Sequence, residues 1–204
     1  MSTVQNIIDG GLAWSTASDQ DVLATDAQLI AVVDLAQKKY FSLANSINPA
    51  FFGKRDTVAA PGANTPWASP SDAEVIYRIE DASGERVRVV DINNQEAAYG
   101  PAVYHVGQGF YSTGTDPNPA SETLTFFFGK QPATVAAVDT SLDGLWHDGD
   151  DSILELEVAM HLAVKDGRAD DVAMLSGLLE GRVNIFTAKV AAFDASVTEA
   201  RLGG

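Results

Sequence analysis

The sequence predicts an α+β fold in which a helical bundle carries an inserted, small antiparallel β unit. Apolar side chains recur at helical intervals over residues 25–47 and again over residues 152–202. Between these segments, residues 73–92 alternate apolar and polar side chains with the period of two that a half-buried strand requires. The expected parts are a helical domain of residues 1–70 and 133–204 and a β domain of residues 71–132.

The first strong helix is expected from Thr25 to Ile47. Thr25 and Gln28 have the spacing of a capping box, in which two side chains satisfy free amides of the first turn. Asn48 precedes a proline, and a residue before proline avoids the helical conformation, so the helix is expected to end there. Residues 54–72, rich in proline and small residues, predict a loop or linker.

The β domain is expected to contain four or more strands. The turn sequence Asp81-Ala82-Ser83-Gly84 separates two alternating runs and predicts a β-hairpin. Two more short strands are expected at residues 101–106 and 123–128, because each run is apolar and is followed by turn-forming residues.

Two helices are expected after the β domain. The first runs from Ser152 to Lys165, with Ser152 and Glu155 as a capping box and Gly167 as the C-terminal cap. The second, with the bundle's longest apolar pattern, is expected from about Asp170 to Leu202. Gly177 and Gly181 lie one turn apart inside it, a spacing that fits either a close approach by another helix or a kink.

Three side chains form a polar stripe on the helix that begins at Ser152. Glu157, His161 and Lys165 recur every four residues. One hypothesis makes Glu157 and His161 a metal or acid–base pair. The favoured interpretation is a largely buried helix whose polar stripe is held by pairs four residues apart. The second histidine of the zinc-protease pattern H-E-x-x-H is missing here.

A second candidate is the segment HDGDD at residues 147–151. His147, Asp148, Asp150 and Asp151 could bind a hard cation, but the glycine and glutamate of a calcium loop are missing at the required spacing. A turn that caps the next helix is therefore the favoured interpretation. His105, in an expected strand, is interpreted as a packing residue. The sequence predicts no catalytic residue, no metal and no cofactor, and with no cysteine it has no disulfide.

The charge pattern argues against stable nucleic-acid binding. The net charge is −15, and no basic run exceeds two residues, whereas binding to phosphates needs lysine and arginine. No apolar run reaches the length of about 18 residues that a membrane helix needs, so no membrane partner is expected. The N-terminus has neither the basic start nor the continuous apolar core of a signal peptide.

Three segments, at residues 25–53, 124–132 and 142–168, resemble the head-to-tail adaptor, or connector, proteins of tailed bacteriophages. The resemblance lies in the order of elements and most of all in LELEVAMHLAVKDGR, a helix that runs through Lys-Asp-Gly into another helix. It implies a structural protein of the virion, without catalysis, made in the host cytoplasm and located at the head–tail junction. It also implies a ring of about twelve copies that binds the portal protein and a neck or tail protein. Genomic DNA would pass through the channel without specific binding.

The resemblance places the portal or oligomer interface on the last helix and its end. The expected interface residues are Gly177, Gly181, Phe186, Val190, Phe193, Val197 and Leu202. Two alternatives stay open. One is another virion protein, such as a neck or tail-completion protein or a head-decoration protein. The other is a small acidic enzyme or ligand-binding protein that uses His105, His147 or His161.

Overall fold

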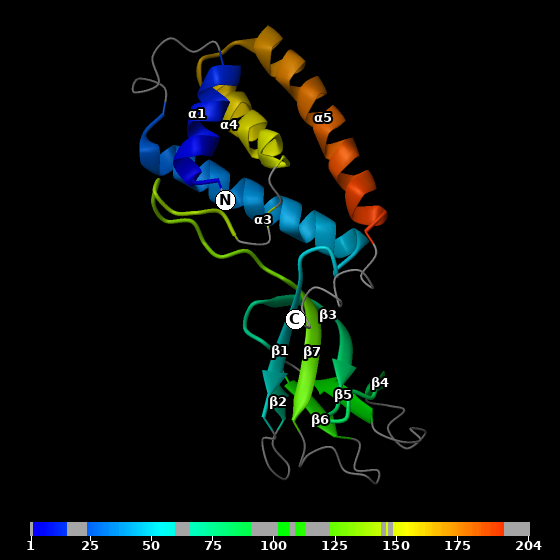
Figure 1. Cartoon of the computed structure of the whole chain (residues 1–204). Coiled ribbons are helices and arrows are strands. Elements are labelled where there is room, and N and C mark those ends of the chain that lie inside the picture. Colours follow the sequence, from blue (N-terminus) through cyan, green and yellow to red (C-terminus); the bar gives the residue numbers. More distant parts are fainter. Residues whose placement is uncertain are drawn as a thin grey trace. The chain divides into compact units, whose positions relative to one another are not determined.

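The computed structural model shows the predicted α+β fold (Figure 1). It describes residues 2–15, 24–59, 66–90, 102–106, 109–112, 123–143, 146 and 149–193. The chain divides into two compact units. The helical unit comprises Met1–Asn48 and Gln131–Gly204, and the β unit comprises Pro49–Lys130.

The β unit begins at Pro49, well before the expected boundary at residue 70. The reason is strand β1 (Gly53–Val58), which lies partly within the expected loop and pairs antiparallel with β7 (Leu124–Lys130). The middle four residues of β1 are exposed, so this edge strand lacks the apolar alternation by which a strand is recognised. The second boundary, after Lys130, lies within two residues of the expected one.

Four helices make up the described part of the helical unit. They are α1 (Val4–Trp14), α3 (Asp26–Ile47), α4 (Asp151–Lys165) and α5 (Ala169–Ala191). Helix α4 contacts α1, α3 and α5, and it buries most of its apolar side chains. The bundle is therefore organised around α4, which makes the most extensive contacts with the three other helices.

Helix α1 was not predicted from the sequence. It buries Val4, Ile7 and Ile8, and it packs closely on α4 through Gly11. A Cβ atom added to Gly11 would lie 2.6 Å from the Cβ of Val158, so only glycine permits this approach.

The helix ends confirm two of the three expected caps. Thr25 and Gln28 form the capping box of α3. Gly167 ends α4 with a φ of +70°, and the amides of Gly167 and Arg168 donate to the carbonyls of Val164 and Ala163 at 3.2 and 3.0 Å. This is a Schellman motif.

The expected capping box at Ser152 and Glu155 is wrong. Helix α4 begins at Asp151, so Ser152 lies inside the first turn rather than before it. The Glu155 carboxylate instead accepts a hydrogen bond from the indole of Trp14 at 3.1 Å, which ties α4 to α1. Helix α5 ends at Ala191, eleven residues before the expected Leu202, and residues 194–204 lie outside the described part of the chain.

The described strands of the β unit form two small sheets, with strand orders β1-β7-β3 and β2-β6-β5-β4. Their side chains share one apolar core, to which Trp67, Phe110, Phe126 and Phe128 contribute the largest groups. The remaining strands are β2 (Trp67–Ala68), β3 (Ala73–Glu80), β4 (Arg88–Val90), β5 (Ala102–Val106) and β6 (Gly109–Ser112).

The predicted turn between β3 and β4 is present, but the hairpin is short. The Asp81 amide donates to the Glu85 carbonyl at 3.0 Å, and Gly84 has a φ of +84°. The second arm follows β3 only as far as Val87, whose amide donates to the Ile79 carbonyl. Strand β4 then joins the other sheet and pairs with β5 in parallel, whereas the other strand pairs described are antiparallel.

Candidate functional site

The polar stripe of α4 faces α3. The Glu157 carboxylate accepts hydrogen bonds from the Tyr40 hydroxyl and the Lys39 ammonium group, each at 2.6 Å. The Lys165 ammonium group donates to the side-chain oxygen of Gln28 at 3.1 Å. The stripe therefore joins two helices, and these partners lie on α3 rather than four residues away on α4.

His161 lies half-buried between the two charged members of the stripe. Its Nε2 atom is buried, and no residue that the structure describes makes a hydrogen bond to it. Burial and, secondarily, the positive charge of Lys165 lower the pKa of His161. Because Glu157 is already bound by Tyr40 and Lys39, the geometry gives His161 no carboxylate partner of the kind that an acid–base pair needs.

The described acids of the HDGDD segment connect parts of the helical unit. The Asp150 carboxylate accepts from the Lys189 ammonium group at 2.7 Å. Asp151 accepts from the Trp146 indole at 2.9 Å and also from the Ser2 hydroxyl. Asp150 makes no capping hydrogen bond, so it fixes α5 rather than capping α4.

The metal hypothesis gains no support from the described residues, which contain no group of three or more histidine, cysteine or acidic side chains placed to hold an ion. His147 and Asp148 lie outside the described residues. His105 is in β5, and its side chain also lies outside the description.

The predicted interface residues of α5 do not share one surface. Phe186 and Val190 are only 1% and 0% exposed, so they belong to the subunit's own core. The Phe186 ring packs edge-on against Tyr40 and stacks on Trp146, with ring centres 6.1 and 6.2 Å apart. A neighbouring protein therefore cannot contact Phe186 or Val190 directly unless the subunit's own core opens.

The other predicted interface residues divide further. Phe193 is half-buried, and its carbonyl accepts from the Asn48 side chain at 2.9 Å. Gly177 and Gly181 are exposed, and a Cβ atom added to either would meet nothing within 4 Å. No other helix of the described chain therefore packs closely against Gly177 and Gly181. Val197 and Leu202 lie outside the described residues.

Around the two glycines, α5 exposes large apolar side chains. Met174, Leu178 and Ile185 are 55%, 43% and 63% exposed. We call Met174, Gly177, Leu178, Gly181 and Ile185 the outer face of α5. The inner face, with Leu175, Leu179, Phe186 and Val190, is buried in the bundle.

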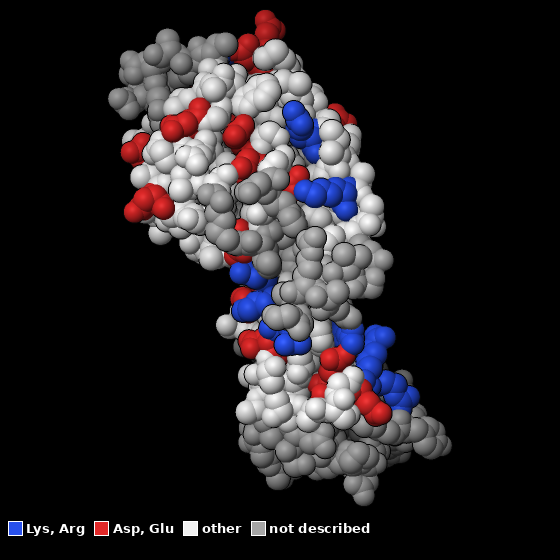
Figure 2. Space-filling model, in the orientation of Figure 1, with Lys and Arg blue, Asp and Glu red and all other residues white. Residues whose placement is uncertain are grey.

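A further feature, missed in the sequence, is a groove of about 1180 Å³ in the β unit. It is lined mainly by β3, β4 and the segment between β2 and β3, and it gathers Arg78, Arg86 and Arg88. Figure 2 shows basic and acidic side chains side by side on the β unit. The Arg-Val-Arg alternation at residues 86–88 was its only sequence signal, and the net acidity of the chain concealed it.

None of the described helices combines the length and apolar character needed to cross a membrane. Comparison with known proteins adds no identification, because no protein-family model and no curated protein sequence matches the chain.

Proposed function

We propose that this protein is a structural subunit of a tailed-phage virion, a ring-forming adaptor that joins the portal of the head to the neck or tail. In this proposal it has no catalytic role, and genomic DNA passes through the ring without specific binding. The observation that carries the proposal is the outer face of α5, an apolar surface that the described part of the subunit leaves uncovered.

A closed ring of identical subunits requires two different, complementary surfaces on each copy. The outer face of α5 supplies one such surface. Its large side chains recur at Met174, Leu178 and Ile185, and the two glycines between them leave room for a neighbouring backbone. The apolar inner face is already used by the fold, so association through the outer face does not require α5 to detach.

The charge of the chain supports a channel for DNA. With a net charge of −15, the subunit repels phosphates, and repulsion lets a polyanion move without adhering to the wall.

Association is tested by placing charges on the outer face. Leu178→Glu with Ile185→Glu is expected to convert a ring-sized oligomer into folded monomers, measured by sedimentation velocity. The matched control is Leu35→Glu with Val164→Glu, two residues that are 66% and 61% exposed on α3 and α4. An oligomer that survives the first pair, or a wild-type protein that stays monomeric at every concentration, would contradict the proposed role of this face.

The adaptor role itself is tested by its partners. Tagged protein recovered from a native lysate is expected to carry portal and tail proteins, identified by mass spectrometry. A chain truncated after residue 192 is expected to stay folded but to fail to join heads to tails. Recovery of metabolic proteins alone, or normal joining by the truncated chain, would refute the adaptor proposal.

A further inference from the structure

Strand β1 is the outermost strand of the β1-β7-β3 sheet, and one side of it has no partner strand among the described residues. Its pairing with β7 is regular over its whole length, from Gly53 opposite Gly129 to Val58 opposite Leu124. A regular edge of this kind is one to which a strand of another molecule can add. The edge therefore needs protection if copies of the protein are not to pair through it.

The alternation of an antiparallel ladder shows which backbone groups of β1 face outward. The Lys130 amide donates to the Phe52 carbonyl at 3.2 Å, so these two opposed residues form a hydrogen-bonded pair. Such pairs alternate with pairs whose backbone groups point away from the partner strand. Counting from Phe52, the residues that point outward are Gly53, Arg55 and Thr57. We call these three the open edge of β1.

Two of the three outward amides are already bonded within the chain. The Gly53 amide donates to the Ala50 carbonyl at 3.1 Å, in the turn that precedes the strand. The Thr57 amide donates to the carboxylate of its neighbour Asp56 at 2.8 Å. Within the described part of the chain, the Arg55 amide has no such acceptor. A strand that adds to this edge must therefore displace the Asp56 carboxylate from Thr57.

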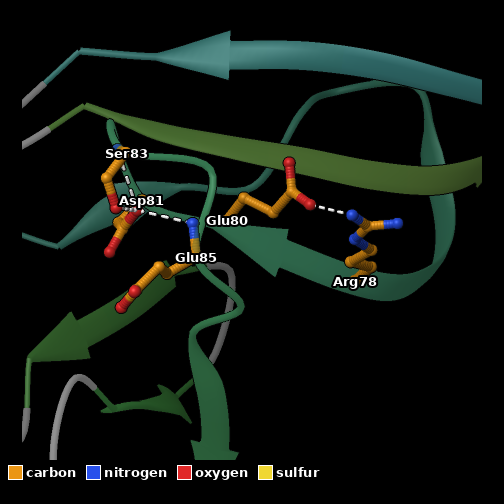
Figure 3. A network of polar contacts seen from close by, with 5 residues as sticks. All are labelled: Arg78, Glu80, Asp81, Ser83 and Glu85. Carbon is orange, nitrogen blue, oxygen red and sulfur yellow. Dashed lines mark hydrogen bonds and ion pairs between the residues drawn. The ribbon is translucent and has the colours of Figure 1, made fainter.

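The opposite edge of the sheet is protected in a different way. Strand β3 has two register shifts against β7, and a hairpin arm covers its end, where the Val87 amide donates to the Ile79 carbonyl at 2.9 Å. Figure 3 shows the turn that holds this arm, in which the Asp81 carboxylate accepts from the amides of Ser83 and Glu85, each at 2.9 Å. Strand β1 has no register shift, and no described segment covers it, so its protection depends on its own side chains.

From this arrangement we infer that Asp56 guards the open edge of β1 against strand addition by a second copy of the protein. Its carboxylate occupies the Thr57 amide, one of the donors that an added strand needs. The side chains from Lys54 to Thr57 are all exposed and three of the four carry a charge, as is common on protected edges. Without the guard, the added strand is β1 of a second copy, because a two-fold axis brings identical edges together.

The test compares two substitutions of Asp56 in the Leu178→Glu, Ile185→Glu protein, so that association through α5 does not contribute. Asp56→Ala removes the acceptor and the charge, whereas Asp56→Asn removes the charge but keeps an acceptor oxygen. In sedimentation velocity, Asp56→Ala is expected to strengthen self-association by about tenfold or more over its parent, since one backbone donor is freed on each copy. Asp56→Asn is expected to behave like the parent. The matched control is Glu85→Ala, which removes an exposed acid of the β unit away from β1 and should leave association unchanged.

Hydrogen exchange tests the guard in the monomer and locates the contact in the dimer. In the unchanged protein the Thr57 amide is expected to exchange slowly, and in Asp56→Ala at low concentration it should exchange about tenfold faster. In the dimer of Asp56→Ala, the amides of Arg55 and Thr57 should both become protected.

Four results would overturn the inference. The first is fast exchange of the Thr57 amide in the unchanged protein, a measurement that does not require any variant to fold. The second is an Asp56→Ala protein that associates no more strongly than its parent. The third is association by Asp56→Asn or Glu85→Ala equal to that of Asp56→Ala, which would assign the effect to charge alone. The fourth is a dimer in which the Arg55 and Thr57 amides exchange freely, which would place the contact elsewhere.

Discussion

The Tyr40 hydroxyl of α3 donates a hydrogen bond of 2.6 Å to the Glu157 carboxylate of α4. Tyr40 is fully buried, and its burial, followed by the hydrogen bond to Glu157 and the charge of that carboxylate, raises the pKa of the phenol far above its ordinary value. The phenol therefore stays a neutral hydrogen-bond donor at neutral pH and above it. This contact makes the polar stripe of α4 part of the bundle's structure.

Replacing Tyr40 with phenylalanine should lower the free energy of unfolding by about 1–3 kcal/mol, because the hydrogen bond to a charged group is lost. Denaturant unfolding measures this loss, and a double-mutant cycle with Glu157→Gln isolates the coupling. The control is Lys39→Met. Its ammonium group also contacts Glu157, but the Lys39 side chain is 59% exposed, so the loss should stay below about 1 kcal/mol. Additive effects of Tyr40→Phe and Glu157→Gln would show that the charge of Glu157 adds nothing to the contact.

Gly11→Ala should destabilise the helical unit by about 1–3 kcal/mol, since the new methyl group would overlap Val158 and force α1 away from α4. Gly181→Ala is the matched change in open space. It should instead stabilise α5 by up to about 1 kcal/mol, because alanine is the better helix former. Thermal unfolding at low protein concentration compares the two, and a tolerated Gly11→Ala would disprove the close packing.

Phe186→Ala should cost about 3–5 kcal/mol of unfolding free energy, as expected for a large side chain removed from a core. Leu178→Ala, on the outer face of α5, should change the stability of the monomer by only about 0.5 kcal/mol. Urea unfolding of the monomer would reveal this contrast. Similar losses at both positions would mean that the two faces of α5 are not distinct.

His161 should make the fold less stable in mild acid. Its pKa in the folded protein is lower than its ordinary value of 6.5, so the unfolded chain binds the proton more readily. The contribution of neutral His161 to the free energy of unfolding is complete above pH 6.5. It decreases as the pH falls from 6.5 toward the lowered pKa of the folded protein. In His161→Gln, the slope of unfolding free energy against pH over this window should be smaller. If the slope in His161→Gln equals that of the unchanged protein, groups other than His161 take up the protons on unfolding.

The two helix caps that were predicted correctly have local signals. Thr25 and Gln28 mark the start of α3, and Gly167 marks the end of α4, because each motif is complete within a few residues. The errors came from contacts between distant segments. β1 is a strand because it pairs with β7, and β4 leaves the hairpin because β5 offers another partner.

The site was predicted only in part for a related reason. Both faces of α5 carry apolar side chains with the same helical period. The sequence therefore does not show which face is buried in the bundle and which stays exposed. The assignment depends on Tyr40 and Trp146, which surround Phe186 from other parts of the chain. The groove of the β unit is likewise lined by β3 and β4, which are close in sequence and in space but belong to different sheets.

The strands at which the chain enters and leaves the β unit are neighbours. Gly53 of β1 lies opposite Gly129 of β7, and the Lys130 amide donates to the Phe52 carbonyl at 3.2 Å. The chain therefore enters and leaves the β unit at adjacent strand ends, and a short turn could join these two ends. A β unit attached in this way can be exchanged, enlarged or removed in evolution, or by design, without rerouting the helices that carry it.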